Sequence, residues 1–370
     1  MKQWPKVKVI ISGGGTGGHI FPAIAIANAI KKMNPQSDIL FIGAKGRMEM
    51  EKVPQAGYDI IGLPIQGIQR KLSVKNLLLP FKLLSSLMQS RKIMRSFKPD
   101  VAVGVGGYAS GPLLYISTSM KIPSLIQEQN SYAGVTNKIL AKRVNKICVA
   151  YEGMETFFPK EKIIVTGNPV RKEVVTNVVP KNEALNFFGL KEGVKTVLVV
   201  GGSLGAGVIN NSIKNNLQAF AGNNIQLIWQ TGKFYYQDLK DVATGYSDRI
   251  KIYDFINRMD MAYSAADVVI SRAGAIAISE LCCLKKAVIL VPSPNVAEDH
   301  QTKNAKALVN KNAAILVKDV EAKDKLMNEV LRLIADEALQ QQLSGNIARL
   351  AYMNADEQIA ETIFKLAEKK

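Results

Sequence analysis

Three glycine-rich segments, each following a short apolar run, could bind an anion in this 370-residue sequence. They are residues 13–18, 104–112 and 201–206. The first comes after the apolar run 9–12 and precedes a helical pattern at 21–32, with Pro22 in its predicted first turn. A strand, a glycine loop and a helix in this order present backbone N–H groups and a helix dipole to an anion. Three such loops at equivalent strand ends favour a ligand-binding edge over simple tight turns.

The first glycine loop also matches the spacing G-x-G-x-x-G of dinucleotide-binding proteins. That pattern needs an acidic residue at the end of the second strand, where it binds a ribose hydroxyl. After the predicted second strand, 39–42, the sequence reads Gly-Ala-Lys, and Asp38 precedes the strand. The sequence therefore argues against an NAD-dependent dehydrogenase.

His19 and Glu128 are two candidates for a general base. His19 is one of only two histidines and follows the first glycine loop, where the helix dipole favours the neutral imidazole that a base needs. Its alternative role is a structural or capping one. Glu128 ends the apolar run 122–128 and has polar neighbours, and the residues alone do not decide between the two bases. His300 fits a nucleotide-side or structural role better than a catalytic one.

Short β-branched runs alternate with helix-length segments along the chain, which predicts parallel sheets covered on both faces. The predicted strands are 7–12, 39–42, 101–104, 122–128, 146–150, 163–166, 196–200, 225–230, 250–254, 268–271 and 287–292. The pattern restarts after the sequence GNPVR at 167–171. We therefore expect two doubly wound α/β domains, 1–167 and 168–350, with a crevice between them.

The composition excludes several classes of protein. Hydrophobic residues make up 47% and charged residues 21%, as in ordinary globular domains. The three cysteines form no disulfide framework, which favours a reduced cytoplasmic protein. No run reaches the roughly 18 apolar residues of a spanning helix, and the N-terminus lacks the features of a signal peptide.

The net charge of +17 is concentrated in one part of the chain. The first 170 residues hold 23 Lys and Arg against 9 Asp and Glu, and residues 60–99 contain no acid. In the segment 69–98, basic residues alternate with apolar ones, which is typical of a helix that lies on anionic lipid. The alternative is a core helix with a solvated basic face. Few aromatic residues interleave, so nucleic-acid binding is disfavoured.

Seven motifs in this order resemble glycosyltransferase family 28. They are GGTGGHI (14–20), GVGGYASGP (104–112), EQN (128–130), GNPVR (167–171), GGSLGA (201–206), SRAGAIAISE (271–280) and DHQTKN (299–304). The resemblance covers essentially the whole chain. It implies a GT-B fold, in which two Rossmann-like domains face a cleft and a C-terminal helix, about 351–370, crosses back to the first domain.

The resemblance also implies a reaction. The family's lipid I transferases move N-acetylglucosamine (GlcNAc) from UDP-GlcNAc, with inversion, to the C4 hydroxyl of the N-acetylmuramic acid of lipid I, an undecaprenyl-pyrophosphoryl sugar pentapeptide. The product is lipid II, for peptidoglycan synthesis. Alternatives are another GT-B transferase that joins a UDP-sugar to a lipid acceptor, such as diacylglycerol, and a non-catalytic nucleotide-sugar-binding protein.

The family's functional residues map onto matching positions of this sequence. Arg171 would reach the nucleotide, Ile256 would contact uracil through its backbone, and Glu280 would bind the ribose hydroxyls. A solvated linker arginine and a helix-dipole partner are the alternatives for Arg171 and Glu280. The remaining expected substrate-binding residues are Thr16, Gly17, Gly18, Tyr108, Asn130, Ser203, Ala275, Ile276, Ala277, Ile278, Ser279 and Gln301, with His19 or Glu128 as the base.

No cofactor or metal is expected, because the Asp-x-Asp pair of metal-dependent glycosyltransferases is absent from the sequence. Backbone N–H groups, Ser203 and a helix N-terminus would stabilise the UDP leaving group instead. Leu204 replaces a glutamine that is frequent in the family, and Ala277 replaces a threonine, so each removes a side-chain hydrogen bond near the donor.

The expected partners are UDP-GlcNAc, lipid I, an anionic membrane surface that contacts segment 69–98, and other cell-wall synthesis proteins. A peripheral location on the cytoplasmic face of the bacterial inner membrane follows from the lipid-linked acceptor.

Overall fold

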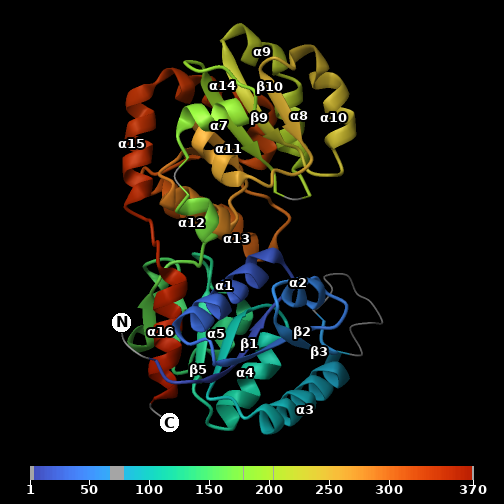
Figure 1. Ribbon diagram of the computed structural model, residues 1–370, viewed down its shortest axis with the longest axis vertical. Helices are drawn as coiled ribbons and strands as arrows, with labels where there is room; N and C mark the ends of the chain where they lie inside the picture. Colours follow the sequence, from blue (N-terminus) through green and yellow to red (C-terminus); the bar gives the residue numbers. More distant parts are fainter. Residues whose placement is uncertain (1–3, 67–78, 178, 203, 369–370) are drawn as a thin grey trace. The chain divides into compact units, whose positions relative to one another are not determined.

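The computed structural model describes residues 4–66, 79–177, 179–202 and 204–368, and its chain divides into two compact units. The first unit contains Met1–Val170 and Asn354–Lys370, and the second contains Arg171–Met353 (Figure 1). The boundary predicted from the sequence falls after residue 167, and the boundary between the two units falls after Val170. Ser203 and residues 69–78 of the basic segment lie outside the described residues.

Among the described residues, the first unit holds a seven-stranded parallel sheet in the order β3-β2-β1-β4-β5-β6-β7. The strands are β1 (Lys8–Gly13), β2 (Asp38–Ala44), β3 (Asp59–Leu63), β4 (Val101–Gly106), β5 (Ser124–Glu128), β6 (Lys146–Val149) and β7 (Ile163–Val165). All were predicted except β3, whose apolar pattern is interrupted by Asp59 and Gly62.

Helices cover both faces of this sheet. They are α1 (Gly17–Met33), α2 (Glu49–Gln55), α3 (Leu79–Phe97), α4 (Ser110–Ser119), α5 (Val135–Leu140) and α16 (Ala355–Ala367). Val9 and Ile11 pack with α1 and α16, whereas Ile10 points to the layer of α3, α4 and α5. Trp4 stacks on Phe364 of α16 at 5.0 Å between ring centroids, and α16 lies beside α1 (Figure 1). The predicted return of the C-terminal helix to the first domain is confirmed.

Helix α1 begins earlier than its apolar pattern predicts. It begins at Gly17 rather than at residue 21, so Pro22 lies in its second turn. The glycines hide this start because they contribute no apolar periodicity. The consequence is that His19 belongs to the first turn of α1, next to the positive end of the helix dipole.

The second unit repeats the plan. Among its described residues is a six-stranded sheet in the order β10-β9-β8-β11-β12-β13. The strands are β8 (Lys195–Val200), β9 (Ile225–Gln230), β10 (Ile250–Tyr253), β11 (Val268–Ser271), β12 (Ala287–Leu290) and β13 (Ile315–Leu316). The α-helices are α6 (Lys172–Val175), α7 (Lys181–Phe187), α8 (Gly207–Lys214), α9 (Leu217–Gly222), α10 (Tyr236–Ala243), α11 (Met259–Ala265), α12 (Ala275–Cys283), α13 (His300–Val309), α14 (Ala322–Ala335) and α15 (Glu337–Ala348). Only β13 was not predicted, since a two-residue strand leaves no pattern.

Both sheets are therefore doubly wound, as predicted. In each, the strand order reverses between the first strand and its neighbour, β1 beside β4 and β8 beside β11. Ligands of such sheets bind outside the carboxyl ends of these strands. The three glycine loops follow β1, β4 and β8, and so lie at these edges.

Two further sequence expectations concern the whole chain. The three cysteines are free and buried. Within the described residues, no helix has both the length and the apolar character needed to span a membrane.

Candidate active site

The loops after β1 and β4 contact each other at the carboxyl edge of the first sheet. The Gly14 N–H donates to the Gly106 carbonyl at 3.3 Å. A Cβ on Gly107, whose φ is +90°, would lie 2.4 Å from the Gly14 carbonyl oxygen, so only glycine allows this approach. The Ser110 hydroxyl contacts the carbonyls of Gly106 and Ser12 at 2.9 and 3.0 Å. The two loops thus form one rigid surface.

His19 lies on this surface, half-buried. Its Nδ1 is 3.0 Å from the Gly14 carbonyl oxygen and 3.4 Å from the Thr16 hydroxyl. Because a carbonyl oxygen only accepts, Nδ1 carries a proton, and Nε2 is the basic nitrogen of the neutral ring. The ring packs on Gly106, where a Cβ would lie 2.8 Å from Nε2. The imidazole is therefore held with its tautomer defined.

Glu128 has a different environment. Its side chain is buried, with 2% of its surface exposed. Oε1 accepts from the Asn130 N–H at 3.1 Å and from the Asn130 amide at 3.3 Å, while Oε2 accepts from the Gly134 N–H at 3.0 Å and from Asn137 Nδ2 at 2.8 Å. Four donors occupy the lone-pair sites of the carboxylate. The four hydrogen bonds hold the 130–137 loop against the end of β5.

The site residues predicted from the sequence in the first unit share this edge of its sheet. They are Thr16, Gly17, Gly18, His19, Tyr108, Glu128 and Asn130. Tyr108 is 48% exposed in the loop after β4. Sequence reasoning missed Asn137, in the first turn of α5, because an isolated asparagine carries no signal until its partner is known.

In the second unit, Arg171 and Glu280 form a two-pronged ion pair. Arg171 Nε donates to Oε1 at 2.7 Å and Nη2 to Oε2 at 2.9 Å. Glu280 is 2% exposed, whereas the arginine side chain is 40% exposed. The hydrogen bond to Glu280 raises the pKa of Arg171, and burial raises the pKa of Tyr263 beside the pair. The resemblance implied a nucleotide contact for Arg171 and a ribose contact for Glu280, and the structure joins the two side chains to each other.

Gln230, at the end of β9, was not predicted as a site residue. Its Oε1 accepts from the Ile256 N–H at 2.9 Å, and its Nε2 donates to the Gly202 carbonyl at 3.2 Å. Ile256 is 3% exposed, and its N–H is already engaged, so a backbone contact to uracil there would use the carbonyl oxygen. A polar residue that ends a buried strand was the signal that could have identified Gln230.

The third glycine loop is fixed by the segment that follows β9. A Cβ on Gly205 would lie 2.1 Å from the Thr231 carbonyl oxygen, and one on Gly232 would lie 2.2 Å from the Gly205 nitrogen. The ring of Tyr235 runs along the loop, with its hydroxyl 2.9 Å from the Cβ position of Gly207. Leu204, where the family often has glutamine, is 65% exposed.

The other predicted donor residues lie in α12 and α13. Ala275, Ile276, Ala277, Ile278 and Ser279 form the start of α12, and only Ile278 of these is buried. The Ser279 hydroxyl donates to the Ala275 carbonyl at 3.0 Å, within the helix. Gln301 Oε1 accepts from the Ser293 N–H at 2.9 Å, so the amide NH₂ of Gln301 points away from Ser293. Among the described residues, no group of three His, Cys, Asp or Glu side chains could hold a metal ion.

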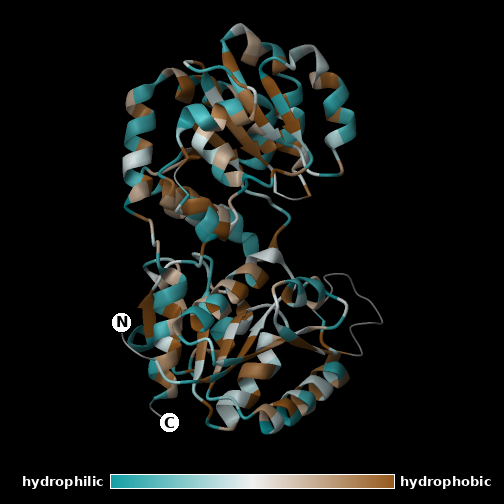
Figure 2. Ribbon diagram, in the orientation of Figure 1, coloured by the Kyte–Doolittle hydropathy of each residue, from teal (hydrophilic) through white to brown (hydrophobic). Residues whose placement is uncertain are grey.

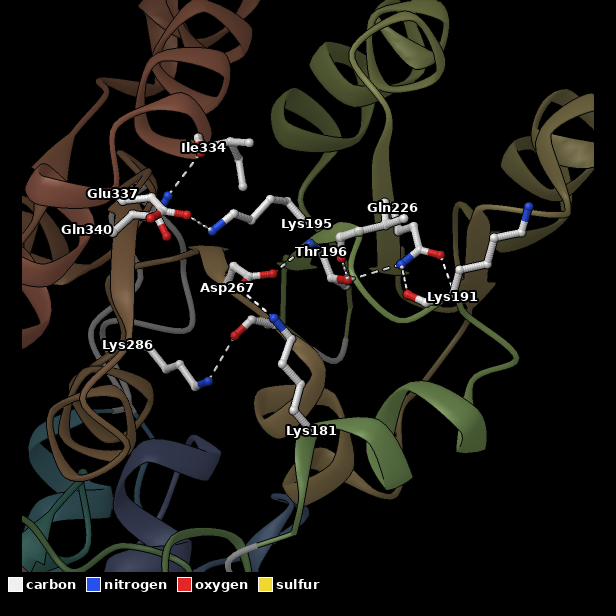
Figure 3. Close-up of polar contacts among 12 residues, drawn as sticks. Lys181, Lys191, Lys195, Thr196, Gln226, Asp267, Lys286, Ile334, Glu337 and Gln340 are labelled. Carbon is white, nitrogen blue, oxygen red and sulfur yellow. Dashed lines mark hydrogen bonds and ion pairs between the residues drawn. The ribbon is translucent and has the colours of Figure 1, made fainter.

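A cavity of about 360 Å³ lies at the opposite edge of the second sheet, at the amino ends of β8 and β11. Lys181 contacts Asp267 at 2.5 Å on its wall, and Lys195 contacts Glu337 at 2.6 Å nearby (Figure 3). These lysines are therefore paired with carboxylates. Because ligands of parallel sheets bind at the carboxyl ends, this cavity is not part of the candidate site.

Lys286 lies close to this cavity and donates to the Ala266 carbonyl at 2.9 Å (Figure 3). Burial lowers the pKa of Lys286 from 10.5 to about 8, with Lys181 acting in the same direction and Asp267 against it. At Lys286 the unfolded chain therefore binds more protons than the folded chain between pH 8 and 10.5, so the contribution of this amine to stability rises with pH across that window.

We expect wild-type protein to gain roughly 2–3 kcal/mol of unfolding free energy relative to Lys286→Met between pH 8 and pH 10. Denaturant unfolding at both pH values measures the difference. Lys285→Met, at the exposed neighbouring position, is the matched control and should follow the wild type. An equal pH response in all three proteins would contradict the burial of this amine.

Two doubly wound units, each with its loops at the carboxyl edge of a parallel sheet, are the arrangement of the GT-B fold. Residues 9–149 match the N-terminal domain of glycosyltransferase family 28, and residues 196–362 match its C-terminal domain. The chain belongs to this family.

Full-length relatives and a solved structure are more specific. The UDP-N-acetylglucosamine--N-acetylmuramyl-(pentapeptide) pyrophosphoryl-undecaprenol N-acetylglucosamine transferase of Parabacteroides distasonis is 56% identical over 366 residues, covering 99% of this chain and 100% of that protein. The transferase of the same name from Flavobacterium psychrophilum is 53% identical and covers 98% of each chain. The crystal structure of Acinetobacter baumannii MurG superposes with a TM-score of 0.80 at 27% identity, covering 98% of this chain and 100% of that one.

Proposed function

We propose that this chain transfers GlcNAc from UDP-GlcNAc to the C4 hydroxyl of the N-acetylmuramic acid of lipid I, forming lipid II for peptidoglycan synthesis. The observation that carries the proposal is the full-length identity of 56% to a transferase named for these substrates. The site geometry agrees with this proposal, because each unit places loops with hydrogen-bonding groups at the carboxyl edge of its sheet.

On the acceptor side, the proposed base is His19. Nε2 removes the C4 hydroxyl proton as that oxygen attacks the anomeric carbon, the bond to UDP breaks, and the configuration inverts. The Gly14 carbonyl holds the proton on Nδ1 and so keeps Nε2 basic. Glu128 then has a positioning role, since its four hydrogen bonds hold the loop that carries Asn130. Thr16, Gly17, Gly18 and Tyr108 are the further acceptor-side contacts.

On the donor side, the proposed contacts are Arg171, Ser203, Ile256, residues 275–280 and Gln301. Negative charge develops on the pyrophosphate as UDP leaves. The N–H groups of loop 201–206 and the start of α8 stabilise that charge together with Arg171, without a metal ion or cofactor. The buried Glu280 carboxylate holds the arginine guanidinium by two hydrogen bonds. Glu280 also belongs to the ribose-binding segment that the resemblance implies.

The direct test incubates the purified chain with lipid I and radiolabelled UDP-GlcNAc, with and without EDTA. We expect labelled lipid II in both cases. Diacylglycerol in place of lipid I tests the alternative acceptor. Absence of lipid II with authentic substrates would overturn the proposal, and binding of UDP-GlcNAc without turnover on any acceptor would instead support a non-catalytic protein.

Helix α3 supports a membrane-facing role for the first unit. Phe81, Leu84 and Met88, one helical stripe, are 71%, 58% and 66% exposed. The same stripe continues into Arg91, Lys92 and Arg95, all exposed, and apolar and polar residues alternate along α3 in Figure 2. An apolar half that enters lipid and a basic half that meets phosphate groups suit an anionic bilayer. We propose a peripheral location on the cytoplasmic face of the inner membrane, near other cell-wall synthesis proteins.

We expect the triple change Arg91→Gln, Lys92→Gln and Arg95→Gln to weaken binding to anionic vesicles at least about 10-fold, at about 1 kcal/mol per basic residue. Flotation with phosphatidylglycerol vesicles measures it. The matched control neutralises three exposed lysines of the second unit, Lys214, Lys240 and Lys323. Equal loss in both triples would mean that net charge, and not helix α3, controls binding.

A further inference from the structure

Glu49, the first residue of α2, is a carboxylate buried beneath the first glycine loop, with 1% of its surface exposed. Its Oε2 accepts from the Gly15 N–H at 2.9 Å, and its Oε1 accepts from the Ala44 N–H at 3.0 Å. Its side chain fills space that two glycines leave open. A Cβ on Gly14 would lie 2.2 Å from Oε1, and a Cβ on Gly43 would lie 2.6 Å from Cγ. The contact therefore depends on Glu49 and both glycines together.

Loops of this kind bind anions in other proteins through their backbone N–H groups. Here one such N–H group, that of Gly15, is bound by a carboxylate of the chain itself. Charge-assisted hydrogen bonds from two N–H groups offset the cost of burying the Glu49 carboxylate. Glu49 thus supports the loop from inside, as a bound anion would.

The supported loop is the one that orients His19. Two hydrogen bonds hold the segment around Gly14. The Gly15 N–H donates to Glu49, and the Gly14 N–H donates to the Gly106 carbonyl. The Gly14 carbonyl in turn accepts from His19 Nδ1 at 3.0 Å. A shift of the Gly14–Gly15 peptide would move the acceptor that keeps the proton on Nδ1.

We propose that Glu49 is a positioning residue for His19: its buried carboxylate holds the Gly14–Gly15 peptide, and that peptide fixes the imidazole tautomer with Nε2 basic. The proposal rests on the proposed function insofar as His19 is the base. Glu49 itself contacts neither substrate nor reacting atoms.

The experiment compares Glu49→Gln with the wild type. A glutamine amide accepts from one N–H but presents its own NH₂ to the other, so the loop must shift. The matched control is Glu51→Gln on the same helix, whose side chain is 67% exposed. The tautomer of His19 is measured by nitrogen-15 NMR of histidine-labelled full-length chain, which contains only two histidines, with His19→Ala assigning the signal.

In Glu49→Gln we expect a mixed His19 tautomer and a kcat at least about 10-fold lower, with KM for UDP-GlcNAc within about twofold of wild type. Glu51→Gln should match the wild type in all three. Unchanged His19 signals and kcat in a folded Glu49→Gln variant would overturn the proposal. A changed tautomer with full turnover would support the positioning by Glu49 and overturn His19 as the base.

A second measurement does not depend on the folding of any Glu49 variant. Neutral His19 of the wild type should carry its proton on Nδ1. A predominantly Nε2-protonated ring in the wild type would overturn the proposal, because the Gly14 carbonyl would then not be its partner.

Discussion

Replacement of His19 by alanine is expected to lower the rate of lipid II formation by about 10²–10⁴-fold at saturating substrates, the range that general-base catalysis contributes. The affinity for UDP-GlcNAc should remain unchanged, because the proposed donor contacts belong to the second unit. Turnover with radiolabelled donor and calorimetric titration with UDP-GlcNAc measure the two quantities. Retention of more than a tenth of the turnover would exclude His19 as the base.

Glu128→Gln is the comparison that separates the two candidate bases. Its amide cannot accept four donors, so the 130–137 loop loses order and turnover falls. Because Glu128 is proposed to act by holding this loop, part of the turnover should remain in Glu128→Gln, whereas His19→Ala removes the proposed base itself. A larger loss of turnover in Glu128→Gln than in His19→Ala, with both variants folded, would identify Glu128 as the base.

Replacement of Arg171 by alanine is expected to weaken UDP binding about 10–100-fold, which corresponds to about 1.4–2.8 kcal/mol. The change removes the cation that we propose to lie beside the nucleotide, and it leaves the carboxylate of Glu280, 2% exposed, without its two-pronged partner. The free energy of unfolding should fall as well. Calorimetric titration with UDP and denaturant unfolding of the same samples measure the two effects.

The double variant Arg171→Ala, Glu280→Gln completes a double-mutant cycle. We expect it to recover part of the lost stability, since the unpaired buried charge is gone, but not the affinity for UDP. Arg332→Ala is the control, because it removes an equally short pair with Glu329 on the surface of α14 at 2.6 Å. A UDP affinity that survives in Arg171→Ala would remove this arginine from the donor site.

Most of the fold follows from local patterns. Continuous β-branched runs predict all strands except β3 and β13, because a strand buried on both faces must be apolar along its length. Asp59 and Gly62 interrupt the apolar pattern of β3, and β13 is too short to form a pattern. The first turn of α1 was not predicted because the glycines at 17 and 18 give it no apolar periodicity.

The sequence by itself determined the fold class, the edges at which the glycine loops lie and the family, because these depend on periodicity and on ordered motifs. The tertiary structure alone decided which polar groups meet. Glu49 reaches Gly15 across 34 positions, and Arg171 reaches Glu280 across 109. Strand order brings such residues together, and a local pattern carries no information about it. The donors to Glu128 lie within 9 positions of it in the sequence, and here it is the path of the 130–137 loop, which folds back onto β5, that brings them to the carboxylate.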